Sequence, residues 1–251
     1  MEYAGPFTEG EGDGVSRYLV AGCTPWAKRI FDTTLSKLPG EWEYVEAPDA
    51  LESCVPDAMS SRGYTLSPPD YIFFLHWRWK VPPEIVNKYP CIGFHLGKLP
   101  HEGGGSPLQW RILEGQRDAC LTEFRMTENM DEGPTLNERT VSLHGSAEEI
   151  YARAMREAAD MIHWRISNPP APPLPVMGER KFYPRRKPED SRIPTGGHVL
   201  LSDVYDWIRC VDADGYPRAF LEYGGLRFEF ERAVLYDGRI KADVTITEIP
   251  V

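Results

Sequence analysis

The sequence predicts an α/β fold in which an open, mostly parallel sheet is flanked by helices and followed by a small β-rich C-terminal region. Two observations support this class. Short apolar runs alternate with helix-like segments as far as residue 167, which is the pattern of strands and helices in an α/β sheet. Proline-dense residues 168–175 (NPPAPPLP) then break the chain, and beyond them the sequence looks mainly β after one short helix.

Four runs are predicted to form strands of the sheet. They are residues 17–22, 71–75, 89–94 and 119–125. The third run is bounded by prolines, as buried parallel strands often are. The last run alternates between apolar and polar residues, which is typical of a strand with one covered face.

Three helices fit between and after these runs. They are predicted at residues 28–37, at residues 107–114 after a glycine-rich turn, and from Ser146 to residue 167. Ser146 and Glu149 match a capping box, in which the two side chains satisfy free amide groups at the start of a helix.

These features divide the chain into four parts. We expect a flexible tail at 1–15, an N-terminal α/β domain at 16–167, a proline-rich linker at 168–195 and a small C-terminal region at 196–251. The last part is expected to hold a helix over 201–210 and a hairpin, with strands at 228–233 and 242–247.

Composition narrows the function classes. The net charge of -10 weighs against a nucleic-acid partner, because binding a polyanion requires several neutralising Lys and Arg contacts. No apolar run is long enough to span a membrane, and the N-terminus lacks a signal-peptide pattern, so a cytoplasmic location is expected. The five cysteines are scattered without metal-ligand spacing, so no metal site is predicted.

One ordered set of residues carries chemistry. His95 follows an apolar run and precedes the turn Gly103–Gly105, and Asp131 stands in the later sequence DEGP. In a parallel sheet the C-terminal ends of strands open onto one crevice, which would bring His95 and Asp131 together. An imidazole beside a carboxylate can move protons and stabilise charge.

This set resembles the signature of formyltransferases that use N10-formyltetrahydrofolate, a family that includes enzymes acting on methionyl-tRNA and on amino sugars. Three further segments resemble the family in the right order: 71–83, 182–193 and 204–220. The resemblance implies a Rossmann-like catalytic domain and transfer of a formyl group to a primary amine.

The resemblance also implies roles for residues. His95 would stabilise the oxyanion, and Asp131 would assist proton removal and orient His95. Cofactor contacts are expected from Trp77, Arg78, Trp79, Lys80, Val81, Pro82, Gly93 and Asp131. Acceptor contacts are expected from His76, Lys98, Gly104, Gly105, Ser106 and Gln109.

Position 93 departs from the family pattern, because Gly93 stands where the family usually has Asn. Losing one oxyanion donor can cost about 10²–10³ in rate. His76 or Lys98 could replace the missing amide, a backbone amide could suffice, or the activity could be weak or altered.

Several alternatives stay open at this point. We expect the acceptor to be a small amine, a nucleotide-linked amino sugar, with methionyl-tRNA as a weaker rival. Water could replace the amine in a hydrolase, or the chain could bind folate or a nucleotide sugar without turnover.

The basic cluster at 185–187 is either a solvated loop or a contact to an acceptor phosphate. The glycine turn is expected to let backbone approach a ligand, and a homodimer through the C-terminal strands is a further option.

Overall fold

The computed structural model describes residues 15–55, 67–168, 172–174 and 181–249. Most of the predicted tail and part of the predicted linker therefore lie outside the described residues.

The strands are β1 (Arg17–Gly22), β2 (Glu41–Val45), β3 (Tyr71–Leu75), β4 (Cys91–Leu96), β5 (Glu102–Gly104), β6 (Asp118–Arg125), β7 (Thr135–Ser142), β8 (Lys181–Tyr183), β9 (Ala219–Tyr223), β10 (Leu226–Tyr236) and β11 (Arg239–Glu248). The helices are α1 (Pro25–Thr33), η1 (Leu35–Lys37), α2 (Pro48–Ser53), α3 (Pro83–Lys88), α4 (Pro107–Leu113), α5 (Ala147–Ser167), η2 (Pro188–Ser191) and α6 (Leu201–Arg209).

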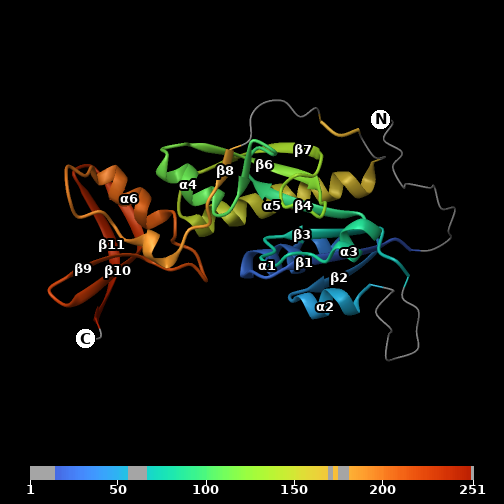
Figure 1. Cartoon of the computed structure of the whole chain (residues 1–251), viewed down its shortest axis with the longest axis horizontal. Helices are drawn as coiled ribbons and strands as arrows, with labels where there is room; N and C mark the ends of the chain where they lie inside the picture. The colour runs from blue at the N-terminus through green and yellow to red at the C-terminus, as the bar shows by residue number, and fades with distance from the viewer. Residues whose placement is uncertain (1–14, 56–66, 169–171, 175–180, 250–251) are drawn as a thin grey trace.

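A six-stranded sheet forms the centre of the molecule, in the order β2-β1-β3-β4-β6-β7 (Figure 1). The first four strands are parallel, and β6 and β7 continue the sheet antiparallel. Helices α1 and α5 pack on one face, whereas α2 and α3 pack on the other. The mostly parallel, helix-flanked sheet that the sequence predicts is confirmed.

Burial explains which strands the sequence reveals. Every residue of β1 is buried, so its sequence is a continuous run without alternation, as expected for a strand covered on both faces. Strand β2 lies at the edge and alternates exposed with partly buried residues, and the sequence prediction missed it. The prediction also missed β7, whose residues are mostly polar.

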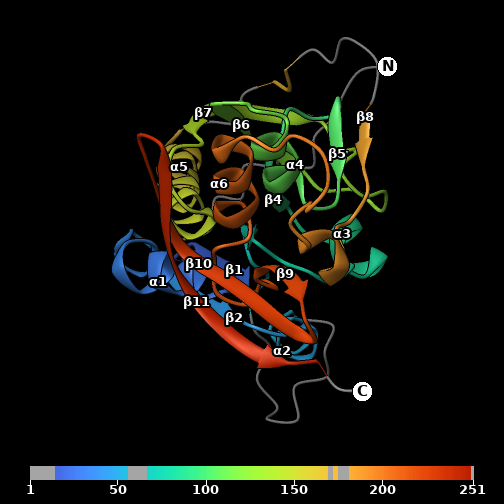
Figure 2. The same ribbon diagram turned by 90° about the vertical axis from the view of Figure 1, so that its left-hand side faces the viewer.

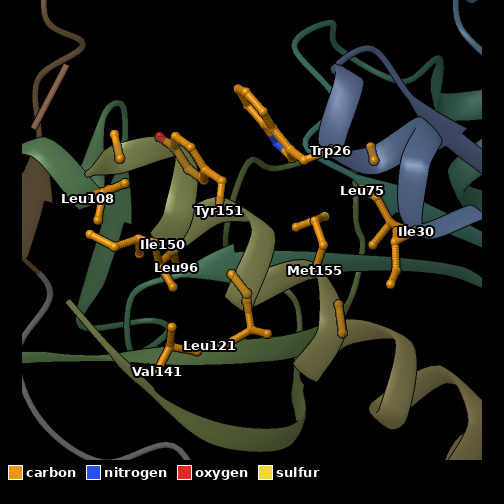
Figure 3. Close-up of a cluster of buried hydrophobic side chains, with 14 of the residues drawn as sticks. Trp26, Ile30, Leu75, Leu96, Leu108, Leu121, Val141, Ile150, Tyr151 and Met155 are labelled. Carbon is orange, nitrogen blue, oxygen red and sulfur yellow. The ribbon is translucent and has the colours of Figure 1, made fainter. Parts of the chain in front are cut away.

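The longest helix, α5, begins as predicted. Ser146 Oγ accepts a hydrogen bond from the Glu149 amide, and the Glu149 carboxylate accepts one from the Ser146 amide. Its buried face packs on the sheet, where Ile150 and Met155 meet Leu121 of β6 in the main core (Figure 3).

The C-terminal region is a three-stranded antiparallel sheet, in the order β11-β10-β9, with α6 packed against it. Figure 2 shows the long β10–β11 hairpin and α6 facing the viewer, in front of the six-stranded sheet. The predicted hairpin is confirmed, with Tyr236 paired to Arg239 across the turn. A register shift between Glu231 and Val234 interrupts the ladder.

Candidate active site

A cavity of about 1220 Å³ opens beside the ends of β3 and β4. Its lining includes most of the residues that the sequence singled out. These are His76, Trp77, Arg78, Trp79, Lys80, Val81, Gly93, His95, Gly104, Gly105, Ser106 and Gln109. Pro82, Lys98 and Asp131 are outside this lining. Lys98 instead places its Nζ 3.6 Å from Glu138 Oε2 on β7, and its contact with the acceptor stays a prediction.

His95 lies inside β4, and its side chain is 10% exposed. Its Nε2 is 2.6 Å from the backbone carbonyl oxygen of Glu102. A carbonyl only accepts hydrogen bonds, so Nε2 carries the proton and donates it. Burial lowers the pKa of His95, the charge of Asp131 opposes that shift and the charge of Arg111 adds to it. The resting imidazole is therefore neutral, with the lone pair on Nδ1.

Asp131 is brought to this imidazole by the loop between β6 and β7. Its Oδ1 lies 3.8 Å from His95 Nδ1, and its Oδ2 accepts a hydrogen bond from the Gly104 amide at 2.9 Å. The side chain is 11% exposed, and the backbone φ is +58°. Gly133 permits this loop path, because a Cβ there would meet the Arg125 carbonyl oxygen at 1.6 Å.

The predicted pairing of His95 with Asp131 is present, but the reason given for it is wrong. Strand β6 runs antiparallel to β4, with Arg125 opposite Ile92. The end of β6 therefore lies beside the start of β4, and the two strand ends do not share an edge. The returning loop, which the alternation pattern cannot show, brings the carboxylate back to the imidazole.

Gly93 leaves no room for the side chain that the family usually carries. A Cβ at this position would lie 2.6 Å and 2.7 Å from two ring carbons of Phe124. Phe124 stands opposite Gly93 in the β4–β6 ladder. The aromatic ring therefore occupies the space that an Asn would enter, and an amide cannot be restored here without moving it.

One side of the cavity is apolar. We call it the apolar wall, and it consists of Phe74, Trp77, Val81, Val86, Phe124 and Met126. Trp77 packs edge-on against Phe74 and Trp79. Its indole Nε1 is buried without a hydrogen-bond partner among the described residues. This side therefore offers flat apolar surface and one free donor.

A second side is built from polar residues, most of them aromatic. We call it the polar wall, and it consists of Trp26, His76, Gln109, Tyr151 and Tyr216. Trp26 and Tyr151 stack with 4.9 Å between their ring centroids. Figure 3 shows the two side chains, which come from α1 and α5. Sequence reasoning missed Trp26, Tyr151 and Tyr216 as site residues, because they come from three separated segments without a shared motif.

Hydrogen bonds link the residues of the polar wall. Trp26 Nε1 donates to His76 Nδ1 at 3.4 Å, so His76 Nε2 carries the ring proton and faces the Tyr216 hydroxyl at 3.4 Å. The Tyr216 and Tyr151 hydroxyls lie 2.7 Å apart. Burial lowers the pKa of His76 to about 4, and the charges of Arg78 and Arg185 act in the same direction. His76 is therefore neutral near pH 7.

Gln109 closes this network and leaves one atom unused. Its Nε2 donates to the Tyr151 hydroxyl at 3.2 Å, whereas its Oε1 is buried without a partner among the described residues. The side chain is almost fully enclosed, since the residue is 1% exposed. A buried carbonyl without a donor is costly, so Oε1 is suited to accept a hydrogen bond from a bound ligand.

Cations gather around the polar wall. Arg78 and Arg185 line the cavity, and neither forms an ion pair with a carboxylate of the described residues. Arg186 lies between Trp110 and Trp207, 5.2 Å from each ring centroid. The basic cluster at 185–187 thus borders the cavity, which favours the phosphate interpretation over a loop surrounded only by solvent.

The glycine turn, whose approach to a ligand stays a prediction, also has a role within the fold. A Cβ on Gly104 would lie 2.3 Å from the Tyr183 carbonyl oxygen, and one on Gly105 would lie 2.6 Å from Arg185 Cα. These glycines let the segment 183–185 pass close to β5, where β5 and β8 pair in parallel. The close backbone approach is therefore to another part of the chain, and it carries Arg185 to the cavity.

Metal-binding groups and membrane-spanning helices are both absent from the described residues. Nowhere in the described ranges do three or more His, Cys, Asp or Glu side chains gather in a way that could hold a metal ion. None of the helices in those ranges has both the length and the apolar character needed to cross a bilayer.

Sequence comparison relates the chain to known proteins in two ways. A family model described as "Methionyl-tRNA formyltransferase, C-terminal domain" matches residues 188–247. A curated methionyl-tRNA formyltransferase from Thermodesulfovibrio yellowstonii is 24% identical over 199 residues, which are 70% of this chain. The match spans 65% of that relative's length, slightly less than two thirds.

Structural comparison gives a closer relative. A methionyl-tRNA formyltransferase from Clostridium thermocellum is 33% identical, with a TM-score of 0.80, covering 93% of this chain and 100% of that one. HypX from Aquifex aeolicus, solved with tetrahydrofolic acid, is 20% identical, with a TM-score of 0.63, covering 88% and 38%. A sugar N-formyltransferase from Shewanella is 15% identical, with a TM-score of 0.58, covering 94% and 99%. The last two similarities concern the fold.

Proposed function

The chain belongs to the formyltransferase family, and we propose that it transfers the formyl group of N10-formyltetrahydrofolate to the primary amine of an acceptor. The observation that carries this proposal is the neutral His95 with Asp131 beside it, at a cavity that has an apolar wall on one side and a polar wall on the other. Acyl transfer to an amine needs a base within reach of both reactants.

The apolar wall suits the folate. A pterin is flat, and Trp77 with Met126 offers it apolar surface. The unpartnered indole Nε1 of Trp77 supplies a donor for a ring acceptor atom. The HypX structure with tetrahydrofolic acid has the same fold, which agrees with a folate site in this cavity.

The chain's own groups then move the proton. N10-formyltetrahydrofolate supplies the formyl carbon, to which the acceptor nitrogen bonds while the bond to N10 breaks. His95 accepts the amine proton on Nδ1, since Nε2 already donates to the Glu102 carbonyl. The resulting imidazolium lies 3.8 Å from the Asp131 carboxylate, which stabilises it. Its Nδ1–H can donate to the oxygen that gains charge and return the proton to the leaving N10.

The polar wall and its cations suit an acceptor that carries phosphate. Arg78 and Arg185 have no carboxylate partner among the described residues, and both lie close enough to His76 to lower its pKa. The N-terminus of α1 adds Thr24, whose Oγ1 is buried without a partner there. Helix N-termini and guanidinium groups both bind phosphate oxygens. We therefore propose a small phosphate-bearing amine, a nucleotide-linked amino sugar, as acceptor.

Methionyl-tRNA is the second candidate. The names of the curated relative and of the structure at 33% identity favour it. The same cations could meet a phosphate at the end of a tRNA. Against it stands the net charge of -10, because neutralising a long polyanion takes many more cations than one cavity rim holds.

An absorbance assay for tetrahydrofolate tests the proposal. N10-formyltetrahydrofolate would be supplied with pooled amino-sugar nucleotides, with methionyl-tRNA, or with no acceptor. Turnover with the sugar pool would support the first candidate, and turnover with methionyl-tRNA alone would support the second. Formate release without acceptor would instead show a hydrolase, and silence with intact folate binding would show a non-catalytic homologue.

We also propose that two copies of the chain pair through β11. This strand is an edge of the C-terminal sheet, and Val244 and Ile246 on it are exposed. It begins at Arg239 and ends at Glu248, so antiparallel self-pairing would place opposite charges across the twofold axis. Light scattering should show a dimer for the natural chain and a monomer for Ile246→Lys. A natural chain that stays monomeric would contradict this pairing.

A further inference from the structure

The contact between His95 and the Glu102 carbonyl depends on Gly97. A Cβ at position 97 would lie 2.8 Å from the Glu102 carbonyl oxygen and 2.8 Å from His95 Nε2. Any side chain at this position would therefore press on both partners of the 2.6 Å contact. Thr122 holds the Gly97 backbone in place, because its hydroxyl donates to the Gly97 carbonyl at 2.7 Å.

The Glu102 backbone is fixed from several directions. Its amide donates to the Lys98 carbonyl at 2.9 Å, and its carboxylate accepts from the Lys98 amide at 2.7 Å. The same carboxylate pairs with Arg111 from α4. Arg111 is buried and also donates to Gln116 Oε1 at 2.5 Å. The carbonyl that meets His95 is thus held by an ion pair that does not line the cavity.

Two groups compete for the proton of the neutral imidazole. Asp131 faces Nδ1 and favours the tautomer with the proton there, whereas the Glu102 carbonyl faces Nε2. The distances decide between them, because 2.6 Å is a short hydrogen bond and 3.8 Å is beyond hydrogen-bond range. The Nε2–H tautomer is therefore favoured only while the Glu102 carbonyl keeps its present position.

We propose that Arg111 and Glu102, with Gly97 providing room, are positioning residues that hold His95 as the Nε2–H tautomer. The effect of this role on catalysis rests on the proposed function, because this tautomer leaves the Nδ1 lone pair free to accept the amine proton. Without the ion pair the carbonyl would shift, the proton would move to Nδ1 toward Asp131, and the base would be lost.

Nitrogen NMR of the ring nitrogens tests the tautomer directly, on the full chain without substrates. The signals of His95 would be identified by their loss in His95→Gln. The natural chain and the control variants Arg117→Met and Gly196→Ala should show the Nε2–H form. Arg117 is exposed, and a Cβ on Gly196 would meet nothing within 4 Å. Arg111→Met and Gly97→Ala should show the Nδ1–H form or a mixture.

Kinetics supply the second readout. In Arg111→Met and Gly97→Ala, kcat should fall about 10–100-fold, as for outer partners that orient an imidazole, while both KM values stay near those of the natural chain. Arg111→Lys should recover part of the rate. Persistence of the Nε2–H form in both folded variants would overturn the proposal. A natural chain that shows this tautomer yet transfers no formyl group would instead overturn the proposed function alone.

Discussion

The two walls of the cavity differ in how many hydrogen bonds their polar atoms form within the protein, and in the groups that they offer to a ligand. The apolar wall contributes packing surface from α3, β3 and β6 and one free indole donor. The polar wall contributes a hydrogen-bond network, an unused carbonyl on Gln109 and neighbouring guanidinium groups.

This difference follows from the sheet. The apolar wall continues the core on the α2–α3 face, where Trp77 and Met126 pack. The polar wall continues the core on the α1–α5 face, where Trp26 and Tyr151 pack. One sheet thus separates two chemically distinct surfaces, and His95 lies where both can be reached. Each surface should be open to change without disturbing the other.

His95→Ala should produce the largest effect. It should slow the reaction without weakening the binding of ligands to either wall. Removing a general base costs about 10²–10⁴ in rate, so kcat should fall by that factor. Because His95 is in neither wall, folate and acceptor should bind within about twofold of the natural affinity, a change far below 1.4 kcal/mol. Single-turnover rates and ligand titrations measure the two quantities. Retained turnover would refute the role of His95.

Arg185→Gln should weaken the polar wall alone. A charge-assisted hydrogen bond to phosphate is worth about 1.5–3 kcal/mol, so the acceptor KM should rise about 10–100-fold while the folate KM is unchanged. Arg29→Gln is the matched control, since Arg29 is exposed on α1 and does not line the cavity. An equal rise in both KM values would show that the walls are not separate.

Trp77→Phe should weaken the apolar wall alone. It keeps an aromatic ring and removes the indole donor, which is worth about 1 kcal/mol as a neutral hydrogen bond. The folate KM should therefore rise about fivefold, and the acceptor KM should not change. Trp164→Phe serves as the control, because Trp164 is an exposed residue of α5 outside the cavity lining. An unchanged folate KM in Trp77→Phe would place the pterin elsewhere.

Much of this arrangement could be predicted from the sequence, and the exceptions have physical causes. The buried strands β1 and β3 and the capped helix α5 carry their own signals in apolar runs and in the Ser146–Glu149 pair. His95 and Asp131 could be paired through the family motif. Only His76 and Gln109 of the polar wall were predicted as site residues. Trp26, Tyr151 and Tyr216 could not be predicted, because they meet only through tertiary packing.

Position 93 shows the same limit at one residue. The sequence reveals that an amide is missing, but only the structure shows Phe124 in its place. Gly93→Ala should cost about 1–3 kcal/mol of unfolding free energy, as overpacking in a core does, because the new Cβ meets the Phe124 ring. Combining it with Phe124→Leu should recover part of that loss, measured by urea unfolding. Equal losses in the single and double variants would show that Phe124 is not the obstacle.

The pH dependence of the reaction should report the pKa of the His95 imidazole, which is set by its surroundings. His95 acts as a base only when neutral, so kcat/KM should fall as pH drops through its pKa. Burial lowers that pKa, which places the acid limb below the ordinary value of about 6.5.

Asp131→Asn sharpens this test. It removes the charge that opposes the lowering, so the acid limb of the residual activity should move to still lower pH. Asp118→Asn, an exposed change outside the cavity lining, should leave the limb in place. An unmoved limb in Asp131→Asn would mean that the carboxylate does not act on the His95 charge, and that the 3.8 Å separation carries no electrostatic coupling.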